Sequence, residues 1–376
     1  MGFLSKLFGG SDSISEALQN SIETQIKQVK IPFTEQDVLE LKALKAMHLK
    51  GADLTLEISL PFPCRSLWPS IEQNLSHHLK QLDGISSVQV EFQTEVVAHD
   101  VQKGTTPMAN IKNIIAVASG KGGVGKSTTS VNLALALQQE GAQVGILDAD
   151  IYGPSIPTML NIKEKPQTKD GKSMQPLEAY GLQAMSIGAL IDEDSPMIWR
   201  GPIVTQTLTQ LLNETNWDNL DYLIIDLPPG TGDVQLTLAQ QIPVTGGVIV
   251  TTPQQVSLID AKKGLKMFQK VEIPVLGIIE NMSTHICSNC GHEEAIFGEN
   301  GGQEMAKKYR VDFLGALPLN KRIREEADQG QPTVTAEPSS EIANKYRHMA
   351  HQISAKVGVK KRNYANLFPN IVVQNT

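Results

Sequence analysis

The residues from Gly120 to Thr128 constrain what this chain can fold into more than any other stretch. They read GKGGVGKST and contain the pattern G-x-x-x-x-G-K-S. An apolar run at residues 114–118 precedes them, and a helix-like stretch at 131–137 follows. A glycine-rich turn between a strand and a helix directs backbone N–H groups, backed by the positive end of the helix, at an anion. The stretch predicts a phosphate-binding loop, or P-loop, whose nucleotide-contacting residues are Gly120, Lys121, Gly122, Gly123, Val124, Gly125, Lys126, Ser127 and Thr128.

The two lysines of this loop have different expected roles. Lys126 is expected to reach the β- and γ-phosphates of ATP, and the Ser127 hydroxyl is expected to hold Mg²⁺. One ammonium is enough for the nucleotide of the loop's own chain. Lys121 directly follows the first glycine, and it is better placed to reach a nucleotide held by a facing subunit, as an arginine finger supplied in trans does. A solvated surface charge is the alternative for Lys121.

Apolar strands alternate with helical stretches along the rest of the chain. The predicted strands are 114–118, 143–148, 222–226, 247–251, 275–279 and 313–317. This alternation indicates an α/β fold with a doubly wound, mostly parallel sheet, in which ligands bind at the carboxyl ends of the strands. Asp226 ends one strand and is expected to hold Mg²⁺, whereas Asp148 and Asp150 end another, where a carboxylate would orient the attacking water. Ordinary loop caps are the alternative for these aspartates.

Cys287 and Cys290 form a C-x-x-C pair, and the chain has three cysteines in all. An iron–sulfur cluster or a zinc ion usually needs four ligands, so two further thiolates must come from elsewhere. A two-fold dimer supplies them, because both cysteines of each copy can meet on the axis, and Lys121 requires the same dimer. Three alternatives stay open: a Cys₂His₂ zinc site completed by His285 and His292, a redox dithiol, and packing cysteines without a ligand.

Several motifs together carry a resemblance to a known family. They are the K-G-G-V-G-K-S-T loop, the stretch DADIYGPS at 148–155, the stretch DLPPGTGD at 226–233, and C-x-x-C-G at 287–291. The loop resembles the deviant P-loop class that includes the nitrogenase iron protein and the MinD and ParA ATPases. The whole set resembles the Mrp/ApbC family of iron–sulfur cluster carrier ATPases.

This resemblance implies a function and several residue roles. It implies a homodimer that hydrolyses ATP slowly, binds a labile [4Fe–4S] cluster through Cys287 and Cys290 of each subunit, and delivers the cluster to apoproteins. The other roles that it implies are an interface lysine at Lys121, a water-positioning carboxylate at Asp150, a second switch at Asp226 and Asp233, and an adenine contact at Asn281.

We expect five segments along the chain. They are an N-terminal extension at 1–30, a small α+β domain at 31–97, a linker at 98–112, the P-loop ATPase domain at 113–355 and a flexible tail at 356–376. The small domain is predicted from a helix start at Thr34, an alternating strand at 54–60, a helix after Ser66 and a second strand at 88–92. It resembles the iron–sulfur assembly domain often found ahead of this ATPase type, although Cys64 is followed by Arg65 where relatives usually have proline.

Composition and charge exclude some function classes. A net charge of −7 argues against nucleic acid as a main partner, because phosphate binding needs a basic surface. No apolar run approaches the ~18–20 residues that span a bilayer. The N-terminus fits neither a secretory nor a myristoylation signal, and Pro369 argues against a terminal membrane helix.

These features favour a cytoplasmic protein without stable membrane anchoring. Its expected partners are a second copy of the chain, cluster donors and apo iron–sulfur proteins, and its expected cofactors are ATP, Mg²⁺ and the cluster. The rival hypotheses are a MinD/ParA-like ATP-driven positioning switch on membrane or DNA, and a zinc-bound P-loop ATPase.

Overall fold

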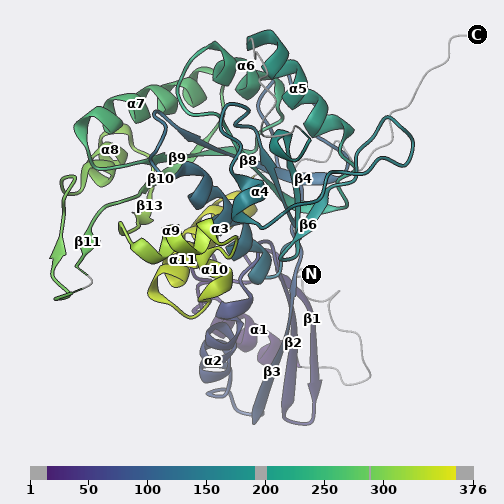
Figure 1. Cartoon of the computed structure of the whole chain (residues 1–376). Helices are drawn as coiled ribbons and strands as arrows, with labels where there is room; N and C mark the ends of the chain where they lie inside the picture. The colour runs from purple at the N-terminus through teal and green to yellow at the C-terminus, as the bar shows by residue number, and fades with distance from the viewer. Residues whose placement is uncertain (1–14, 191–200, 288, 361–376) are drawn as a thin grey trace, which may run out of the picture. The chain divides into compact units, whose positions relative to one another are not determined.

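The computed structural model describes residues 15–190, 201–287 and 289–360 of the chain (Figure 1). These residues separate into two compact units. The smaller unit contains residues up to Val97 together with 139–142 and 354–359, and the larger unit contains the other described residues. The expectations about the extreme N-terminus and about the tail beyond residue 360 lie outside the described residues.

The smaller unit is a three-stranded sheet with helices. Its elements are α1 (Glu16–Ile26), β1 (Leu44–Lys50), β2 (Asp53–Leu60), the 3₁₀ helix η2 (Arg65–Leu67), α2 (Trp68–Leu79) and β3 (Ser87–Thr94). Strand β2 lies in the middle, antiparallel to β1 and parallel to β3. Alternation along β2 buries Leu54, Leu56 and Ile58, and one face of α2 adds Ile71 and Leu75 to the same core. The two strands and the helix predicted for residues 54–92 are present.

Two sequence-based expectations for this unit differ from the structure. Residues 34–42 form turns and no helix, because Asp37 accepts hydrogen bonds from two nearby backbone N–H groups at 2.8 and 3.0 Å. Lys42 then adopts a positive φ of 56°, which is incompatible with a continuing helix. Helix α1 falls in the segment expected to be an extension, yet it contributes Ile22 and Ile26 to the core of this unit.

The larger unit is an α/β domain with helices on both faces of one sheet (Figure 1). Up to the end of β8, its elements are β4 (Ile111–Ser119), α3 (Lys126–Gln139), β5 (Val144–Asp148), α4 (Ile156–Met159), β6 (Leu177–Ala179), β7 (Leu182–Ser186), η3 (Ile187–Ala189), α5 (Gly201–Glu214) and β8 (Leu220–Asp226). They continue with α6 (Asp233–Gln241), β9 (Gly246–Thr251), α7 (Gln255–Lys270), β10 (Val275–Glu280), β11 (His285–Ile286), β12 (Glu293–Glu294), α8 (Gly301–Tyr309), β13 (Phe313–Ala316), α9 (Lys321–Asp328), α10 (Thr333–Ala336) and α11 (Glu341–Gly358). The residues of α11 from 354 onward belong to the smaller unit.

The sheet of this unit has eight strands in the order β13-β10-β9-β4-β8-β5-β7-β6. The edge pair β6–β7 is antiparallel, and the other neighbouring pairs run parallel. All six strands expected from the apolar runs belong to it. The predicted doubly wound, mostly parallel α/β fold is therefore confirmed.

Parallel register brings together the strand ends that carry the predicted site residues. Asp226, the last residue of β8, pairs with Asp148 of β5 on one side and with Val117 of β4 on the other. Strand β4 ends at Ser119 and runs directly into the P-loop. The aspartates therefore lie beside the loop, at the edge of the sheet where ligands bind in such folds.

The last helix continues past Lys356, where the flexible tail was expected to begin. Helix α11 ends at Gly358, and its residues Ala355 and Val357 are fully buried, so apolar packing extends into the expected tail. Within the described ranges, no helix is both long enough and apolar enough to cross a lipid bilayer.

Candidate functional site

The P-loop is a tight turn whose geometry requires glycine. Gly123 and Gly125 have positive φ angles of 78° and 80°, which residues with side chains rarely adopt. A Cβ at Gly125 would lie 2.1 Å from Asn281 Nδ2, and one at Gly120 would lie 2.2 Å from the backbone carbonyl carbon of Asp260. The loop therefore packs directly against the end of β10 and against α7, with no space for side chains at these positions.

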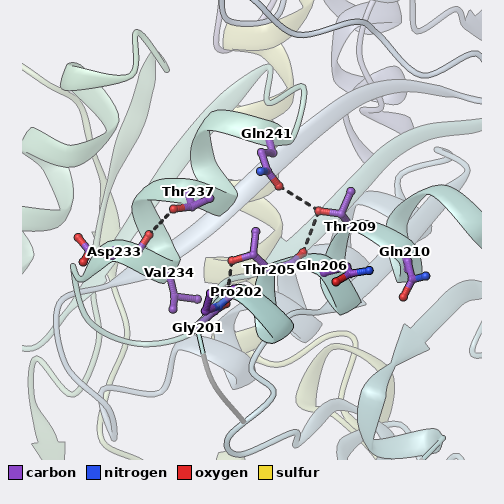
Figure 2. Close-up of a pocket in the computed structure, with 10 residues that line it drawn as sticks. All are labelled: Gly201, Pro202, Thr205, Gln206, Thr209, Gln210, Asp233, Val234, Thr237 and Gln241. Carbon is purple, nitrogen blue, oxygen red and sulfur yellow. Dashed lines mark hydrogen bonds between the residues drawn. The ribbon is translucent and has the colours of Figure 1, made fainter.

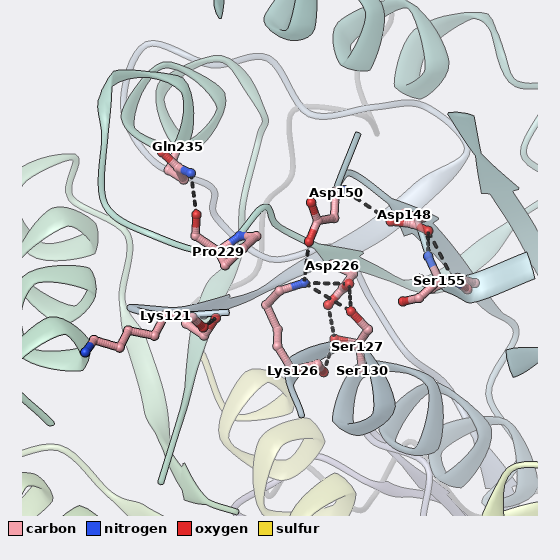
Figure 3. Close-up of polar contacts among 12 residues, drawn as sticks. Lys121, Lys126, Ser127, Ser130, Asp148, Asp150, Ser155, Asp226, Pro229 and Gln235 are labelled. Atoms are coloured by element: carbon pink, nitrogen blue, oxygen red, sulfur yellow. Dashed lines mark hydrogen bonds and ion pairs between the residues drawn. The ribbon is translucent and has the colours of Figure 1, made fainter. Parts of the chain in front are cut away.

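A buried polar cluster surrounds Asp226 behind the loop (Figure 3). Lys126 Nζ lies 2.6 Å from Asp226 Oδ2, and Ser127 Oγ donates to the same oxygen at 2.6 Å. Ser130 Oγ donates to Asp226 Oδ1, also at 2.6 Å. The side chains of Lys126 and Asp226 are 5% and 0% exposed. Each of these polar contacts is strengthened by the low dielectric of the buried site.

Ser130 is the member of this cluster that was not predicted. It lies three residues after Ser127 on α3, and this spacing places both hydroxyls on one face of the helix. The sequence therefore contained a signal for Ser130, since the same face also carries the lysine that contacts Asp226.

The two aspartates at the end of β5 have different surroundings. Asp150 Oδ2 lies 4.0 Å from Lys126 Nζ, and burial raises the pKa of Asp150. Burial, followed by the charge of nearby Asp226, raises the pKa of Asp148 to about 7. Asp148 accepts hydrogen bonds of 3.1–3.2 Å from the N–H groups of Asp150, Ser155 and Ile156 and from the hydroxyl of Ser186. Asp148 thus organises the loop backbone, whereas Asp150 faces the P-loop lysine.

Lys121 does not join the buried cluster and points away from Lys126 (Figure 3). Its Nζ lies 3.7 Å from Asp260 Oδ2 on α7, and Asp260 also pairs with Lys263 at 2.7 Å. The Lys121 side chain is 43% exposed, and ion pairs at such surfaces contribute little to stability. The contact with Asp260 is therefore easily exchanged for another. The predicted reach of Lys121 into a second subunit stays a prediction.

Asn281 lies against the P-loop. Its Nδ2 donates to the carbonyl oxygen of Val124 at 2.9 Å, and the residue is only 8% exposed. This bond uses one of the two N–H bonds of the amide, so the group still has a donor and an acceptor with which to pair an adenine edge. The adenine contact itself stays a prediction.

The C-x-x-C pair lies on a small hairpin that leaves the sheet after β10. Strands β11 and β12 pair antiparallel, and Cys287 N–H donates to the carbonyl oxygen of His292 at 2.9 Å. Cys290 is exposed and Cys287 is partly exposed. Hydrogen bonds from the backbone of Cys290, and next from that of Asn289, lower the pKa of Cys287. A lowered pKa favours the thiolate, which is the form that binds metals.

The hairpin does not contain a complete set of metal ligands. In the part of the chain that the structure describes, no three His, Cys, Asp or Glu side chains are grouped to hold a metal ion. His285 and His292 therefore do not complete a Cys₂His₂ site with the two cysteines in this structure. Two thiols are presented, which is half of what a four-coordinate centre or a cluster requires.

The third cysteine has a different environment. Cys64 is fully buried in the core of the smaller unit, and this burial raises its pKa to about 12. A neutral, buried thiol behaves as a small apolar side chain. A packing role for Cys64 therefore fits its surroundings better than metal or redox chemistry.

A pocket of about 750 Å³ lies between α5 and α6 (Figure 2). Most of its lining residues are threonines and glutamines, with Thr205 and Thr209 on one helix and Thr237 on the other, although atoms of apolar groups form the larger part of its surface. The hydroxyl of Thr209 donates to Gln241 Oε1 at 3.2 Å and so links the two helices. Asp233, predicted to belong to the second switch, begins α6 and also lines this pocket. Any movement of the start of α6 would therefore change the shape of the pocket.

Comparisons with known families agree with both units. The ParA family model, described as NUBPL iron-transfer P-loop NTPase, matches residues 110–354. A second model, described as iron–sulfur cluster assembly protein, matches residues 19–92. The first match contains the P-loop, the aspartates and the cysteine hairpin, and the second contains the three-stranded sheet except for the last two residues of β3.

Curated relatives are similar over most of the chain. The iron–sulfur cluster carrier protein of Haemophilus influenzae is 50% identical over 348 residues, which cover 92% of this chain and 94% of that protein. The protein of the same description from Escherichia coli K12 is 48% identical over 343 residues, covering 91% and 93%. The mouse iron–sulfur cluster transfer protein NUBPL is 46% identical over 277 residues, covering 73% and 86%.

Solved structures share the fold of the larger unit. A nucleotide-binding protein from Archaeoglobus fulgidus, in complex with ADP, is 37% identical with a TM-score of 0.54, covering 62% of this chain and 90% of that one. The septum site-determining protein MinD from Pyrococcus horikoshii, complexed with Mg-ADP, is 22% identical with a TM-score of 0.50, covering 66% and 98%. The second similarity shows the fold alone.

Proposed function

Since this chain belongs to the family of NUBPL iron-transfer P-loop NTPases, we propose that it is a homodimeric ATPase that carries an iron–sulfur cluster between its subunits and transfers it to apoproteins. The family matches confirm the resemblance inferred from the motifs. One observation carries the proposal: a complete P-loop and an exposed pair of thiols, insufficient for a cluster by itself, belong to the same unit. We expect this chemistry in the cytoplasm, where thiols stay reduced.

The buried polar side chains around Asp226 would bind ATP and its metal ion. Lys126 would exchange its contact with Asp226 for the β- and γ-phosphates of the nucleotide. Asp226 is 0% exposed and so needs a cation beside it after the lysine has moved. Ser127 Oγ and Asp226 Oδ2 lie 2.6 Å apart, and hydroxyl and carboxylate oxygens are suited to Mg²⁺, so these two residues would hold the ion directly or through water. Bound there, Mg²⁺ would neutralise charge on the phosphates.

Hydrolysis would be directed by the loop after β5. Asp150 lies with its Oδ2 4.0 Å from Lys126 Nζ. From this position it would orient a water molecule in line with the γ-phosphorus. The water oxygen forms a bond to phosphorus as the bond to the bridging oxygen of ADP breaks, and the proton leaves through Asp150 to solvent. Asp148 would keep this loop in place through its hydrogen bonds to three backbone N–H groups.

The dimer would complete both sites. Lys121 would leave Asp260 and contact the nucleotide of the second subunit, which places ATP at the interface. Cys287 and Cys290 of both subunits would then hold one cluster, proposed to be [4Fe–4S], on the two-fold axis. A small separation of the subunits would weaken this ligation, so the nucleotide state would control loading from a donor and release to an apoprotein.

The decisive experiment compares the three cysteines. We expect Cys287→Ala and Cys290→Ala to lose the bound cluster after anaerobic reconstitution, because each removes two of four thiolates in the dimer. ATP affinity should stay within about twofold, since no P-loop contact changes. Cys64→Ala is the matched control and should retain the cluster with lower stability. A full iron–sulfur absorbance, with unchanged iron and sulfide content, in the Cys287→Ala protein would refute the assignment.

A further inference from the structure

A short stretch of backbone joins the P-loop to the cysteine pair. Asn281 directly follows strand β10, and Cys287 comes six residues later. Asn281 is buried, and its Nδ2 donates to the carbonyl oxygen of Val124 in the P-loop at 2.9 Å. A Cβ on Gly125, the next residue of the loop, would lie 2.1 Å from the same nitrogen. The stretch from 281 to 287 therefore begins in close contact with the loop.

The carbonyl group that Asn281 contacts belongs to the peptide unit between Val124 and Gly125. No peptide bond is cis in the described residues, so the C=O and N–H groups of this unit point in opposite directions. The C=O group faces Asn281, and the N–H group of Gly125 faces away from it. In a P-loop such N–H groups bind the phosphates of the nucleotide. A phosphate that turns this planar unit would therefore also move the acceptor of the Asn281 amide.

Backbone hydrogen bonds hold the stretch along its length. Three of them, between 2.7 and 2.9 Å, join it to the end of β9 and to the segment after β13: Asn281 N–H to Thr251, Ser283 N–H to Leu317, and Leu319 N–H to the carbonyl oxygen of Thr284. Met282 has a positive φ of 56°, so the chain turns between the first two of these bonds. Backbone that is paired in this way can transmit a displacement from one end to the other.

The two cysteines lie at the far end of this stretch. His285 forms a parallel bridge with the segment after β13. Beyond it, Cys287 N–H donates to the carbonyl oxygen of His292, and Gly291 N–H donates to that of Cys287, both at 2.9 Å. The turn that carries the thiols is thus closed by its own hydrogen bonds. Its orientation is therefore set where the hairpin joins the domain, at residues 283–285.

We propose that Asn281 is a positioning residue for the cysteine pair, through which the nucleotide at the P-loop changes the placement of Cys287 and Cys290 in the same chain. The inference rests on the nucleotide binding of the proposed function, and it adds a form of control that needs no second subunit. The predicted adenine contact would act on the same amide, so the base and the phosphates would both affect this side chain. A bound nucleotide would then orient the thiols before two subunits meet around a cluster.

Alkylation of the cysteines in the cluster-free, full-length protein tests this coupling. The rates of reaction of Cys287 and Cys290 with iodoacetamide are measured by peptide mass spectrometry, without nucleotide and with saturating Mg-ADP. A Lys121→Ala background, at a concentration where sedimentation velocity shows a monomer, removes effects of a second subunit. We expect Mg-ADP to change the rate at one or both cysteines at least about fivefold. Adding Asn281→Ala should reduce this change to less than about twofold at full nucleotide occupancy.

Gln183→Ala is the matched control in the same background. Gln183 Nε2 also donates to a backbone carbonyl oxygen at 2.9 Å, that of Asp218, but it lies on β7, four strands away from β10 in the sheet. This variant should retain the full response to Mg-ADP. A full response in Asn281→Ala, or a response that occurs only in dimers, would overturn the inference.

A second measurement does not depend on the Asn281 variant. In the monomeric background, Mg-ADP should slow hydrogen exchange of the Ser283 and Leu319 amides at least about fivefold, because a P-loop fixed by phosphate holds the stretch more firmly. Exchange that is not slowed would also overturn the inference. The proposed function would still stand after either result, because the cysteine variants described above test it separately.

Discussion

At the scale of single residues, Asp226 connects the parts of the nucleotide site. Its two carboxylate oxygens accept from Ser127 and Ser130 and face Lys126, all within 2.6 Å, in a position without solvent exposure. Removing a partner of such a buried ion pair usually costs several kcal/mol, because the remaining charge is left uncompensated. Residues around Asp226 are therefore expected to affect folding as well as catalysis, and tests must separate the two effects.

Asp150 offers a clean separation of binding from hydrolysis. We expect Asp150→Asn to bind ATP with nearly normal affinity, because Lys126 and Ser127 are unchanged, and to lose about 10²–10⁴-fold in kcat, since the amide cannot take a proton from the water. Equilibrium binding and single-turnover hydrolysis measure the two quantities. Lys126→Ala is the comparison and should lose ATP binding itself. A normal kcat in Asp150→Asn would remove this residue from the mechanism.

Asp148 predicts a pH dependence of stability. Its carboxyl has a pKa of about 7 in the folded chain against an ordinary value of 3.8, so the folded state binds the proton more tightly. Stability should therefore fall as pH rises from about 4 to about 7 and level off above that.

The variant Asp148→Asn should lack this contribution. The difference in unfolding free energy between the two proteins, measured by denaturant titration without nucleotide, should change on the order of 2 kcal/mol in favour of the variant as pH rises from 5 to 8. A difference in unfolding free energy that does not change with pH would contradict the raised pKa of Asp148.

At the scale of elements, the P-loop is positioned by the backbone of a neighbouring helix. A Cβ on Gly120 would meet the carbonyl carbon of Asp260 at 2.2 Å, whereas one on Gly122 would meet only Pro229 Cγ, at 3.9 Å. Helix α3, which begins at Lys126, is itself buried along most of its length. The loop is thus fixed between a buried helix and α7, and this rigidity preorganises its N–H groups for an anion.

The two glycines allow a direct test of this packing. Gly120→Ala should lower the stability of the nucleotide-free protein by about 2 kcal/mol and separate the loop from α7, because backbone atoms cannot move aside as a flexible side chain can. Gly122→Ala has space around it and should unfold within about 1 °C of the unaltered protein. Thermal unfolding by calorimetry measures both. Equal melting temperatures for the two variants would show that the close contact with α7 does not exist in solution.

At the scale of the whole molecule, the proposed function depends on the number of cluster ligands that one copy can supply. Each chain has two accessible thiols and one buried thiol. If the cluster lies between subunits, a dimer made of one unaltered chain and one Cys287→Ala, Cys290→Ala chain retains only two thiolates. We expect such a tagged, co-purified hybrid to bind no cluster, while it still binds two ATP molecules. One cluster in each hybrid would show that the two thiolates of one chain suffice, and it would refute the site shared between subunits.

The sequence predicted those parts of the fold and of the site that depend on short stretches of neighbouring residues. Apolar runs located all six strands of the parallel sheet, and the order of motifs placed Lys126, Asp150 and Asp226 at its ligand-binding edge. Contacts made through the fold were not predictable. Asp260 meets the P-loop across more than 130 residues of chain. The turn at Asp37 was mistaken for a helix start because the same side-chain hydrogen bonds cap both structures.

The size of the cysteine hairpin has a consequence for how such proteins diversify. Strands β11 and β12 have two residues each and form a sheet of their own, separate from the eight-stranded one. If Cys287 and Cys290 bind the cluster as we propose, the ligands of the cargo lie in a segment that contributes no strand to the eight-stranded sheet. Substitutions in those few residues during evolution could therefore change what the protein carries while the ATPase fold stays the same.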